Sequence, residues 1–223
     1  VCFSSYLQFL VMGIKNKIDF QIDTLSNESN VNRARNSCAA KFLVGDATHL
    51  MFVDADIQFE ASSIVKLITA EKDIIGAIYP KKVLPPSMVV NTIPDGKVEG
   101  DLMEVGTLGT GFMLIKRTVF EKMIESGVQK YHDDIGLSAE ADDNQYDFFN
   151  CTIDSQGRYL TEDWSFCAKW RELGGEIWID KSIPLAHMGA HKFLPTTEYL
   201  ERKEFKEDLE LVMTNGEQEV IIK

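Results

Sequence analysis

Two aspartates two positions apart, Asp54 and Asp56, follow the apolar run LMFV (50–53). The run is too short for a helix, and its composition is typical of a strand buried in a parallel sheet. In an extended segment residues i and i+2 point the same way, so the two carboxylates should face one small volume. A divalent cation would remove their repulsion, and Mg²⁺ or Mn²⁺ suits such oxygen ligands. Solvated loop residues or helix caps are the alternative interpretation.

Charged residues also stand at the starts of two expected helices. Glu162 and Asp163 open the helix expected at 161–175, where acidic side chains could serve catalysis or simply balance the helix dipole. Arg33 and Arg35 lie near the start of an earlier helix. A guanidinium there could bind a diphosphate or remain solvated.

Two loops at strand ends carry further residues suited to ligand binding. His187 lies in LAHMGAHKF, just past a strand expected at 176–180, and His191 follows four residues later. A lone histidine is more often structural, but one that joined the aspartates would make a mixed nitrogen and oxygen site, which favours Mn²⁺ over Mg²⁺. The glycines of GTLGTGF (106–112) would let a ligand approach the backbone closely. This segment leads into a strand, so as a phosphate-binding loop it is a weak match.

Size and charge limit the possible functions. The 223 residues suit one α/β domain, or one domain with a small appendage, and a net charge of −12 argues against nucleic-acid binding. No apolar run approaches the roughly 18–20 residues that span a membrane, and the first residues do not resemble a signal peptide. No two cysteines have CxxC spacing, so we expect free thiols in a reducing, cytoplasmic compartment for Cys2, Cys38, Cys151 and Cys167.

Helical and strand patterns alternate along the chain, which indicates an α/β/α sandwich with a mainly parallel central sheet. Helices are expected at 3–14, 31–43, 61–72, 117–127, 161–175 and 198–213. Strands are expected at 19–25, 50–53, 73–80, 109–116, 146–151 and 176–180. The apolar residues of the first helix should form one stripe, made of Phe3, Tyr6, Leu7, Leu10, Val11 and Ile14.

The order of these segments resembles that of GT-A-fold glycosyltransferases, which use nucleotide-diphosphate sugars. The resemblance is carried by ARN, ATHLMFVDADI, IIGAIYPKK, GTGFMLIKR, YLTEDWSFCAKW and PLAHMGAHKF, over about residues 30–195. The chain looks most similar to compact members from phages, giant viruses and bacterial polysaccharide clusters, and a viral chain would act in the host cytoplasm. A DxD tripeptide, a later ED at a helix start and a following histidine are together more specific than the tripeptide alone.

The resemblance implies a role for each candidate residue. The ligands of Mn²⁺, or of Mg²⁺, would be Asp54, Asp56 and His187. The donor, expected to be a UDP-sugar, would be bound by Arg35, Asp54, Ala55, Lys82 and Gly111. Asp163 would be the general base of an inverting transfer, and Glu162 would hold hydroxyl groups. The implied activity is metal-dependent transfer of a hexose or pentose to a hydroxyl of a glycan acceptor.

One departure from the family pattern concerns the front of the chain. Such folds usually open with a strand that holds the nucleotide base, whereas this sequence starts at what looks like the following helix, so that strand is expected upstream or absent. Residues 1–195 would form the catalytic domain and 196–223 a helical tail.

Three other functions stay open for the same motifs. A haloacid-dehalogenase-like phosphatase would use Asp54 as its nucleophile, but Ile57 and the late position of the motif disfavour it. A sugar-1-phosphate nucleotidyltransferase would need a glycine-rich N-terminal loop with arginine, and none is visible. The third alternative is a non-catalytic module that binds a sugar nucleotide or a glycan.

Overall fold

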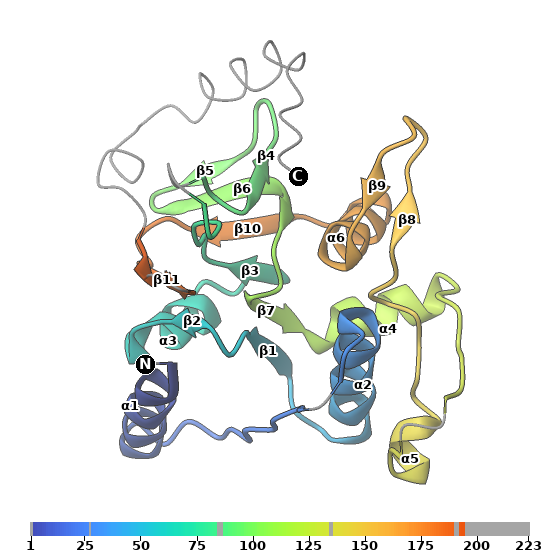
Figure 1. Cartoon of the computed structure of the whole chain (residues 1–223), viewed down its shortest axis with the longest axis horizontal. Helices are drawn as coiled ribbons and strands as arrows, with labels where there is room; N and C mark the ends of the chain where they lie inside the picture. The colour runs from blue at the N-terminus through green and yellow to red at the C-terminus, as the bar shows by residue number, and fades with distance from the viewer. Residues whose placement is uncertain (1, 27, 84–86, 134–135, 190–191, 195–223) are drawn as a thin grey trace.

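The computed structural model describes residues 2–26, 28–83, 87–133, 136–189 and 192–194. The tail expected at 196–223, with its helix at 198–213, lies outside the described residues, as does His191. Within the described ranges the chain is an α/β fold in which helices flank a mixed seven-stranded sheet (Figure 1). In that part of the chain no helix is long and apolar enough to cross a membrane.

The elements follow one another in the order that Figure 1 labels. The helices are α1 (Cys2–Lys15), α2 (Val31–Val44), α3 (Ala61–Thr69), α4 (Arg117–Glu125), α5 (Ala139–Asp142) and α6 (Glu162–Glu172). The strands of the central sheet are β1 (His49–Val53), β3 (Ile74–Gly76), β4 (Val90–Thr92), β5 (Val98–Glu99), β6 (Leu102–Leu108), β7 (Phe112–Lys116) and β10 (Ile177–Asp180). Two smaller sheets contain β2 (Ile57–Gln58), β8 (Thr152–Ile153), β9 (Tyr159–Leu160), β11 (Ala186–Met188) and β12 (Lys192–Phe193).

The central sheet has the order β1-β7-β3-β10-β6-β4, with β5 paired to β6. Among its described pairings only β3 with β10 is parallel, and the others are antiparallel. The expected mainly parallel sheet is therefore wrong. Strands β6 and β7 both run against the β3–β10 pair, and β1 and β4 run against β7 and β6 in turn, so every pairing that involves β6 or β7 is antiparallel.

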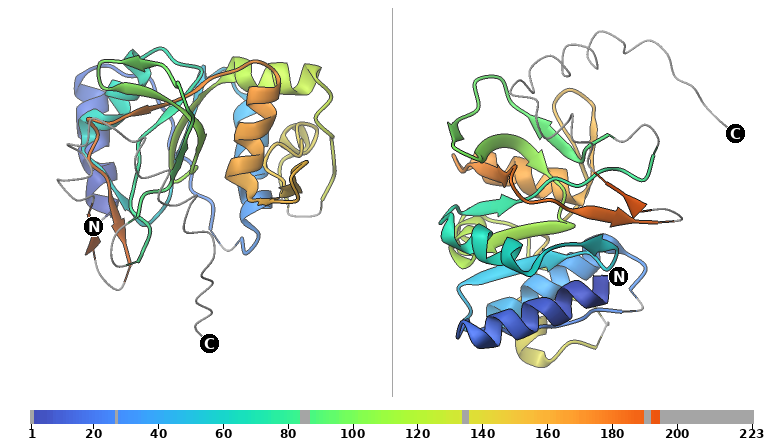
Figure 2. Two further views of the ribbon diagram at one scale, coloured as in Figure 1. Left: turned by 90° about the horizontal axis from the view of Figure 1, so that it is seen from above. Right: turned by 90° about the vertical axis from the view of Figure 1, so that its left-hand side faces the viewer.

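Alternate residues of the inner strands pack on opposite faces of the sheet, as the pleat requires. Along β7, Phe112 and Leu114 join one core, and Met113 and Ile115 join the other. Helices α1 and α3 cover the first face, and α2, α4 and α6 cover the second (Figure 2). The three layers fix the sheet, so the loops at its edges start from rigid positions.

Helix α1 packs through a different face from the expected stripe. Phe9 is 6% exposed and lies in the core, whereas Phe3, Val11 and Ile14 are 72%, 68% and 71% exposed. The helix is apolar on nearly all sides, so periodicity alone could not say which side is buried.

Two expected strands are wrong as well. Residues 19–25 form no strand and are mostly exposed, and 146–151 contain a turn with a single bridge from Tyr146 to Lys130. Conversely, the sequence interpretation did not predict β4, β5 or β6. These errors all fall in segments outside the buried strands that carry the candidate site.

Candidate active site

Asp54 and Asp56 lie in the tight turn that joins β1 to β2. The Asp54 amide donates to the Gly111 carbonyl at 2.9 Å, and the Ile57 amide donates to the Asp54 carbonyl at 3.0 Å. The segment is thus a turn rather than extended chain, and Ala55 is its exposed tip. The expected extended segment is therefore wrong, and each carboxylate has its own cationic partner.

Arg35 reaches Asp54 from α2. Its Nη2 lies 2.5 Å from Asp54 Oδ1, and its guanidinium carbon lies 5.0 Å from the centroid of the Phe52 ring. The arginine side chain is 13% exposed, and within the described residues its buried Nε has no hydrogen-bond partner. The stacked guanidinium is therefore held in place, with Nη2 directed at Asp54.

Strand β11 brings His187 to Asp56. It pairs with β2, and the Met188 amide donates to the Asp56 carbonyl at 2.7 Å. His187 Nε2 lies 3.4 Å from Asp56 Oδ2, and its Nδ1 lies 2.8 Å from the Pro80 carbonyl oxygen. A carbonyl only accepts, so Nδ1 carries a proton. Lys82 Nζ lies 2.5 Å from the same Asp56 oxygen.

Tyr79 lies between the Arg35–Asp54 pair and the Asp56–His187 pair. The sequence patterns did not identify it. Its hydroxyl accepts a hydrogen bond from the Gly111 amide at 3.2 Å, and its ring meets the His187 ring edge-to-face with centroids 5.2 Å apart. A Cβ added to Gly111 would lie 2.7 Å from the Tyr79 hydroxyl and 3.0 Å from Asp54 Oδ2. Burial, with the nearby Asp54 charge, raises the pKa of Tyr79 well above its usual range. The only sequence signal was its place at the end of a buried strand.

Asp163 lies in the first turn of α6 and takes part in capping. Thr161 is the N-cap residue, but its hydroxyl donates to Asp163 Oδ1 instead of accepting from the helix. The Trp164 amide donates to the same oxygen at 2.8 Å. Both hydrogen bonds go to Oδ1, so among the described contacts Oδ2 keeps its capacity to accept a proton.

The start of α6 lies within electrostatic range of three other candidate residues. Burial raises the pKa of Glu162, and the neighbouring Asp163 charge raises it further. Arg35 opposes this shift and Asp54 adds to it, so both lie within electrostatic range of Glu162. The Asp163 charge likewise acts on Tyr79. The structure therefore brings the predicted residues to one end of the sheet, at the carboxyl ends of β1 and β3.

The residues here fit a divalent cation in part. Among the described residues no group of three or more His, Cys, Asp or Glu side chains is placed to hold a metal ion. Asp56 and His187 do offer facing oxygen and nitrogen donors, and the Pro80 carbonyl orients the imidazole as in many metal sites. Lys82 already places a positive charge against Asp56. This donor pair suits Mn²⁺, with the remaining positions filled by ligand oxygens.

Comparisons with known proteins give no family. No family model matches the chain, and no curated protein matches it. Among solved structures, the chain is similar to the crystal structure of A197 from STIV, with 20% sequence identity and a TM-score of 0.48. The match covers 89% of this chain and 91% of that one. A similarity of this degree carries no information on activity.

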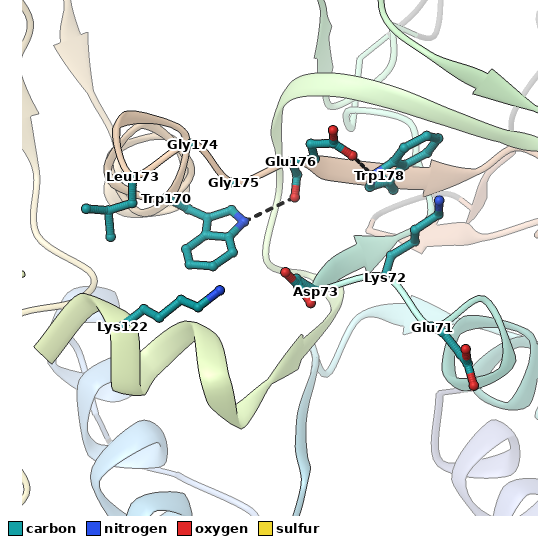
Figure 3. A pocket seen from close by; sticks show the side chains of 10 residues that line it. All are labelled: Glu71, Lys72, Asp73, Lys122, Trp170, Leu173, Gly174, Gly175, Glu176 and Trp178. Atoms are coloured by element: carbon teal, nitrogen blue, oxygen red, sulfur yellow. Dashed lines mark hydrogen bonds between the residues drawn. The ribbon is translucent and has the colours of Figure 1, made fainter. Parts of the chain in front are cut away.

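A separate pocket of about 290 Å³ lies at the opposite edge of the sheet, where β3 and β10 begin (Figure 3). Trp170 and Trp178 are each only 2% exposed there. The Trp170 indole donates to the Glu176 carbonyl at 3.2 Å, and the Trp178 indole donates to the Glu176 carboxylate at 3.1 Å. The pocket is lined by Glu71, Lys72, Asp73, Lys122, Trp170, Leu173, Gly174, Gly175, Glu176 and Trp178.

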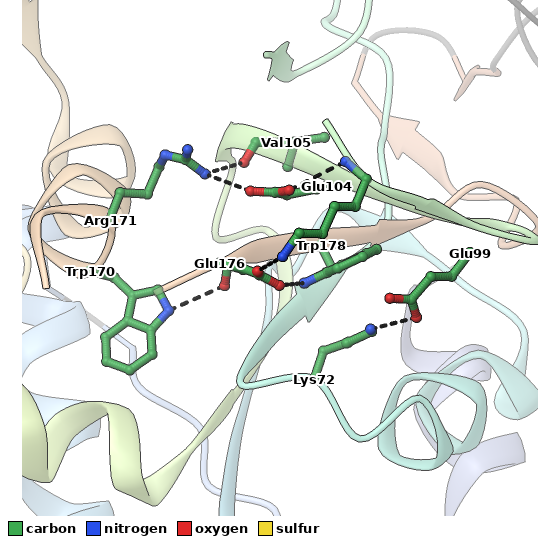
Figure 4. A network of polar contacts seen from close by, with 9 residues as sticks. Lys72, Glu99, Glu104, Val105, Trp170, Arg171, Glu176 and Trp178 are labelled. Carbon is green, nitrogen blue, oxygen red and sulfur yellow. Dashed lines mark hydrogen bonds and ion pairs between the residues drawn. The ribbon is translucent and has the colours of Figure 1, made fainter. Parts of the chain in front are cut away.

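A network of paired charges adjoins this pocket (Figure 4). Lys72 lies 2.6 Å from a Glu99 oxygen and 3.7 Å from the centroid of the Trp178 ring. Glu176 forms an ion pair with Lys97. These charged groups are already satisfied by protein partners, so the network supports the start of β10 and offers little to a ligand.

Proposed function

We propose that this chain is a metal-dependent glycosyltransferase that moves a sugar from a nucleotide diphosphate, expected to be UDP, to a hydroxyl of a glycan acceptor. One observation supports the proposal above the others. Asp56 meets both Lys82 and His187 at the sheet edge where Arg35 holds Asp54. Cationic groups beside a candidate metal pair are what a diphosphate leaving group requires.

In this proposal the binding roles are divided between two clusters. Asp56 and His187 would hold the metal, which when bound supplies positive charge to the departing diphosphate. Arg35 and Lys82 would donate to phosphate oxygens through the guanidinium and ammonium groups that now pair with Asp54 and Asp56. Gly111 would let the sugar approach the backbone beside Tyr79, because no side chain fits there.

Asp163 would remove the proton from the acceptor hydroxyl. The acceptor oxygen attacks the anomeric carbon, its proton passes to Asp163 Oδ2, and the bond from that carbon to the phosphate oxygen breaks with its electron pair. This single displacement inverts the anomeric centre. The raised pKa of Glu162 suits it to hydrogen bonding with sugar hydroxyls.

A donor screen tests the proposal. The protein would be incubated with Mn²⁺, a mixture of disaccharide acceptors and one donor at a time: UDP-glucose, UDP-galactose, UDP-N-acetylglucosamine or GDP-mannose. We expect nucleotide release with at least one donor, and about a hundredfold or greater loss of transfer in Asp163→Asn, the scale of a general-base contribution. Asp143→Asn, at a side chain that is 79% exposed, is the matched control.

One result would reject the proposed activity, and another would reject the proposed role of Asp163. The first is the absence of transfer with every donor, together with release of phosphate from phosphate esters and a covalent phosphate on Asp54, which defines a phosphatase. The second is transfer that survives in Asp163→Asn, which would place the base elsewhere or require a retaining mechanism.

A further inference from the structure

The β8–β9 hairpin leads directly into α6 and exposes two large side chains. Thr152 pairs with Leu160, and Ile153 pairs with Tyr159. Leu160 is 8% exposed, whereas Ile153 and Tyr159 are 71% and 64% exposed. The alternation of strand side chains thus turns one cross-strand pair inward and the other into solvent. Tyr159 and Ile153 are neighbours on that outer face, which is called the hairpin platform below.

The hairpin platform is held in one conformation by its own turn and by α6. The Asp154 carboxylate accepts from the amides of Gln156 and Arg158, each at 2.9 Å, and from Arg158 Nε at 2.7 Å. The Thr152 hydroxyl donates to the Ser165 hydroxyl of α6 at 3.2 Å. A ligand that binds here therefore meets a surface that needs little ordering.

Polar contacts connect the hairpin platform to the candidate active site. The Cys151 thiol raises the pKa of Tyr159, and its Sγ accepts from Asn32 Nδ2 at 3.3 Å. Asn32 belongs to α2, the helix that carries Arg35. The Glu162 charge also acts on Tyr159. The hairpin thus contacts α6, which carries the proposed base, and the residue before it contacts α2, which carries Arg35.

We propose that the hairpin platform binds the acceptor, and that the acceptor is a pyranose-containing glycan whose ring packs against Tyr159. The assignment to the acceptor rests on the proposed function. A pyranose has apolar C–H faces and a polar rim, which match an exposed aromatic ring that has the polar side chains of Cys151 and Glu162 nearby. Two side chains are far too little for a protein acceptor, because specific protein interfaces bury about 800 Å² per partner.

Saturation-transfer NMR with maltose, cellobiose, lactose and chitobiose tests this inference. Each disaccharide would be titrated into the full chain with UDP and Mn²⁺ present. We expect at least one to bind the wild type, and Tyr159→Ala to weaken that binding about tenfold, which equals ~1.4 kcal/mol. Tyr159→Phe, which keeps the ring, should lose much less. Val98→Ala, at an exposed apolar residue of β5, is the control.

The outcomes separate this inference from the proposed function. Equal binding by wild type and Tyr159→Ala, or no binding of any of the four disaccharides, would overturn the proposal that the hairpin platform binds the acceptor. UDP affinity measured in the same samples should be unchanged in Tyr159→Ala, since Tyr159 contacts the acceptor alone. Disaccharide binding that depends on Tyr159 in a protein that does not bind UDP would support a glycan site and reject sugar transfer.

Discussion

The imidazole of His187 faces the carboxylate of Asp56 at 3.4 Å, although Asp56 follows β1 and His187 lies beyond β10. The pairing of β11 with β2 fixes this meeting, because it sets His187 opposite Ile57. The backbone therefore positions the two donors. Substitution of either side chain should change ligand binding without unfolding the protein.

His187→Ala should weaken Mn²⁺ binding, because it removes the nitrogen donor and leaves Asp56 alone. We expect a loss of roughly 10–100-fold in metal affinity, the range for disturbed metal sites. Titration of free Mn²⁺ by electron paramagnetic resonance measures it. His132→Ala, at a side chain that is 70% exposed, should bind as the wild type does. Equal affinity in both variants would remove His187 from the site.

Lys82→Ala should have opposite effects on two ligands. Its ammonium competes with a metal ion for Asp56, so its removal should raise the affinity for Mn²⁺ alone. The same change removes a donor for phosphate oxygens, so UDP affinity in Mn²⁺ should fall by about tenfold, the cost of one charge-assisted hydrogen bond. Calorimetry of both ligands measures the pair of shifts, with exposed Lys81→Ala as control. Two shifts of the same sign would contradict the assignment.

Gly111→Ala should damage the candidate site through Tyr79. The new Cβ would lie 2.7 Å from the Tyr79 hydroxyl, so the ring or the turn of Asp54 must move. The expected loss of stability is about 1–3 kcal/mol, typical of overpacking, together with weaker UDP binding. Urea denaturation and calorimetry measure these. Gly45→Ala, whose Cβ would meet its nearest neighbour at 3.9 Å, should change neither.

Glu162→Gln should change how stability depends on pH. Burial raises the folded-state pKa of Glu162 above its ordinary value of 4.5, so the folded state binds more protons than the unfolded state just above that value. The free energy of unfolding contributed by this residue therefore falls as pH rises from about 4.5 through the folded-state pKa, and it stays lower above that pKa. The glutamine variant lacks this loss, so it should gain stability relative to wild type between about pH 4.5 and about pH 7. Urea denaturation at both pH values measures the difference, and a constant difference would exclude a raised pKa.

Much of the candidate site could be predicted from the sequence, because its residues stand at the ends of buried strands and at helix starts. LMFV (50–53) forms β1, and Glu162 begins α6, as expected. The approach of His187 to Asp56 depends on β2 and β11, which are two and three residues long. Such short strands carry no recognisable periodicity, so their pairing could not be predicted.

Other features depend on tertiary contacts that the pattern does not encode. Tyr79 enters the site because glycines at 109 and 111 leave room for its ring, and either Cβ would crowd it. The mixed order of the sheet depends on β6, whose sequence LMEVGTL lacks a clear alternation. The buried side of α1 is decided by packing against α3 and β2, since the helix is apolar on most sides.

Calorimetric titration of UDP into wild type and Asp56→Asn, each with Mn²⁺ and with EDTA, tests the central claim most directly. The wild type should bind UDP in Mn²⁺ at least about tenfold more tightly than in EDTA, and Asp56→Asn should lose this difference. Asp46→Asn, at an exposed loop position, should keep it. UDP affinity that is the same with Mn²⁺ and EDTA, or that is unchanged in Asp56→Asn, would contradict a metal-dependent nucleotide site at Asp56.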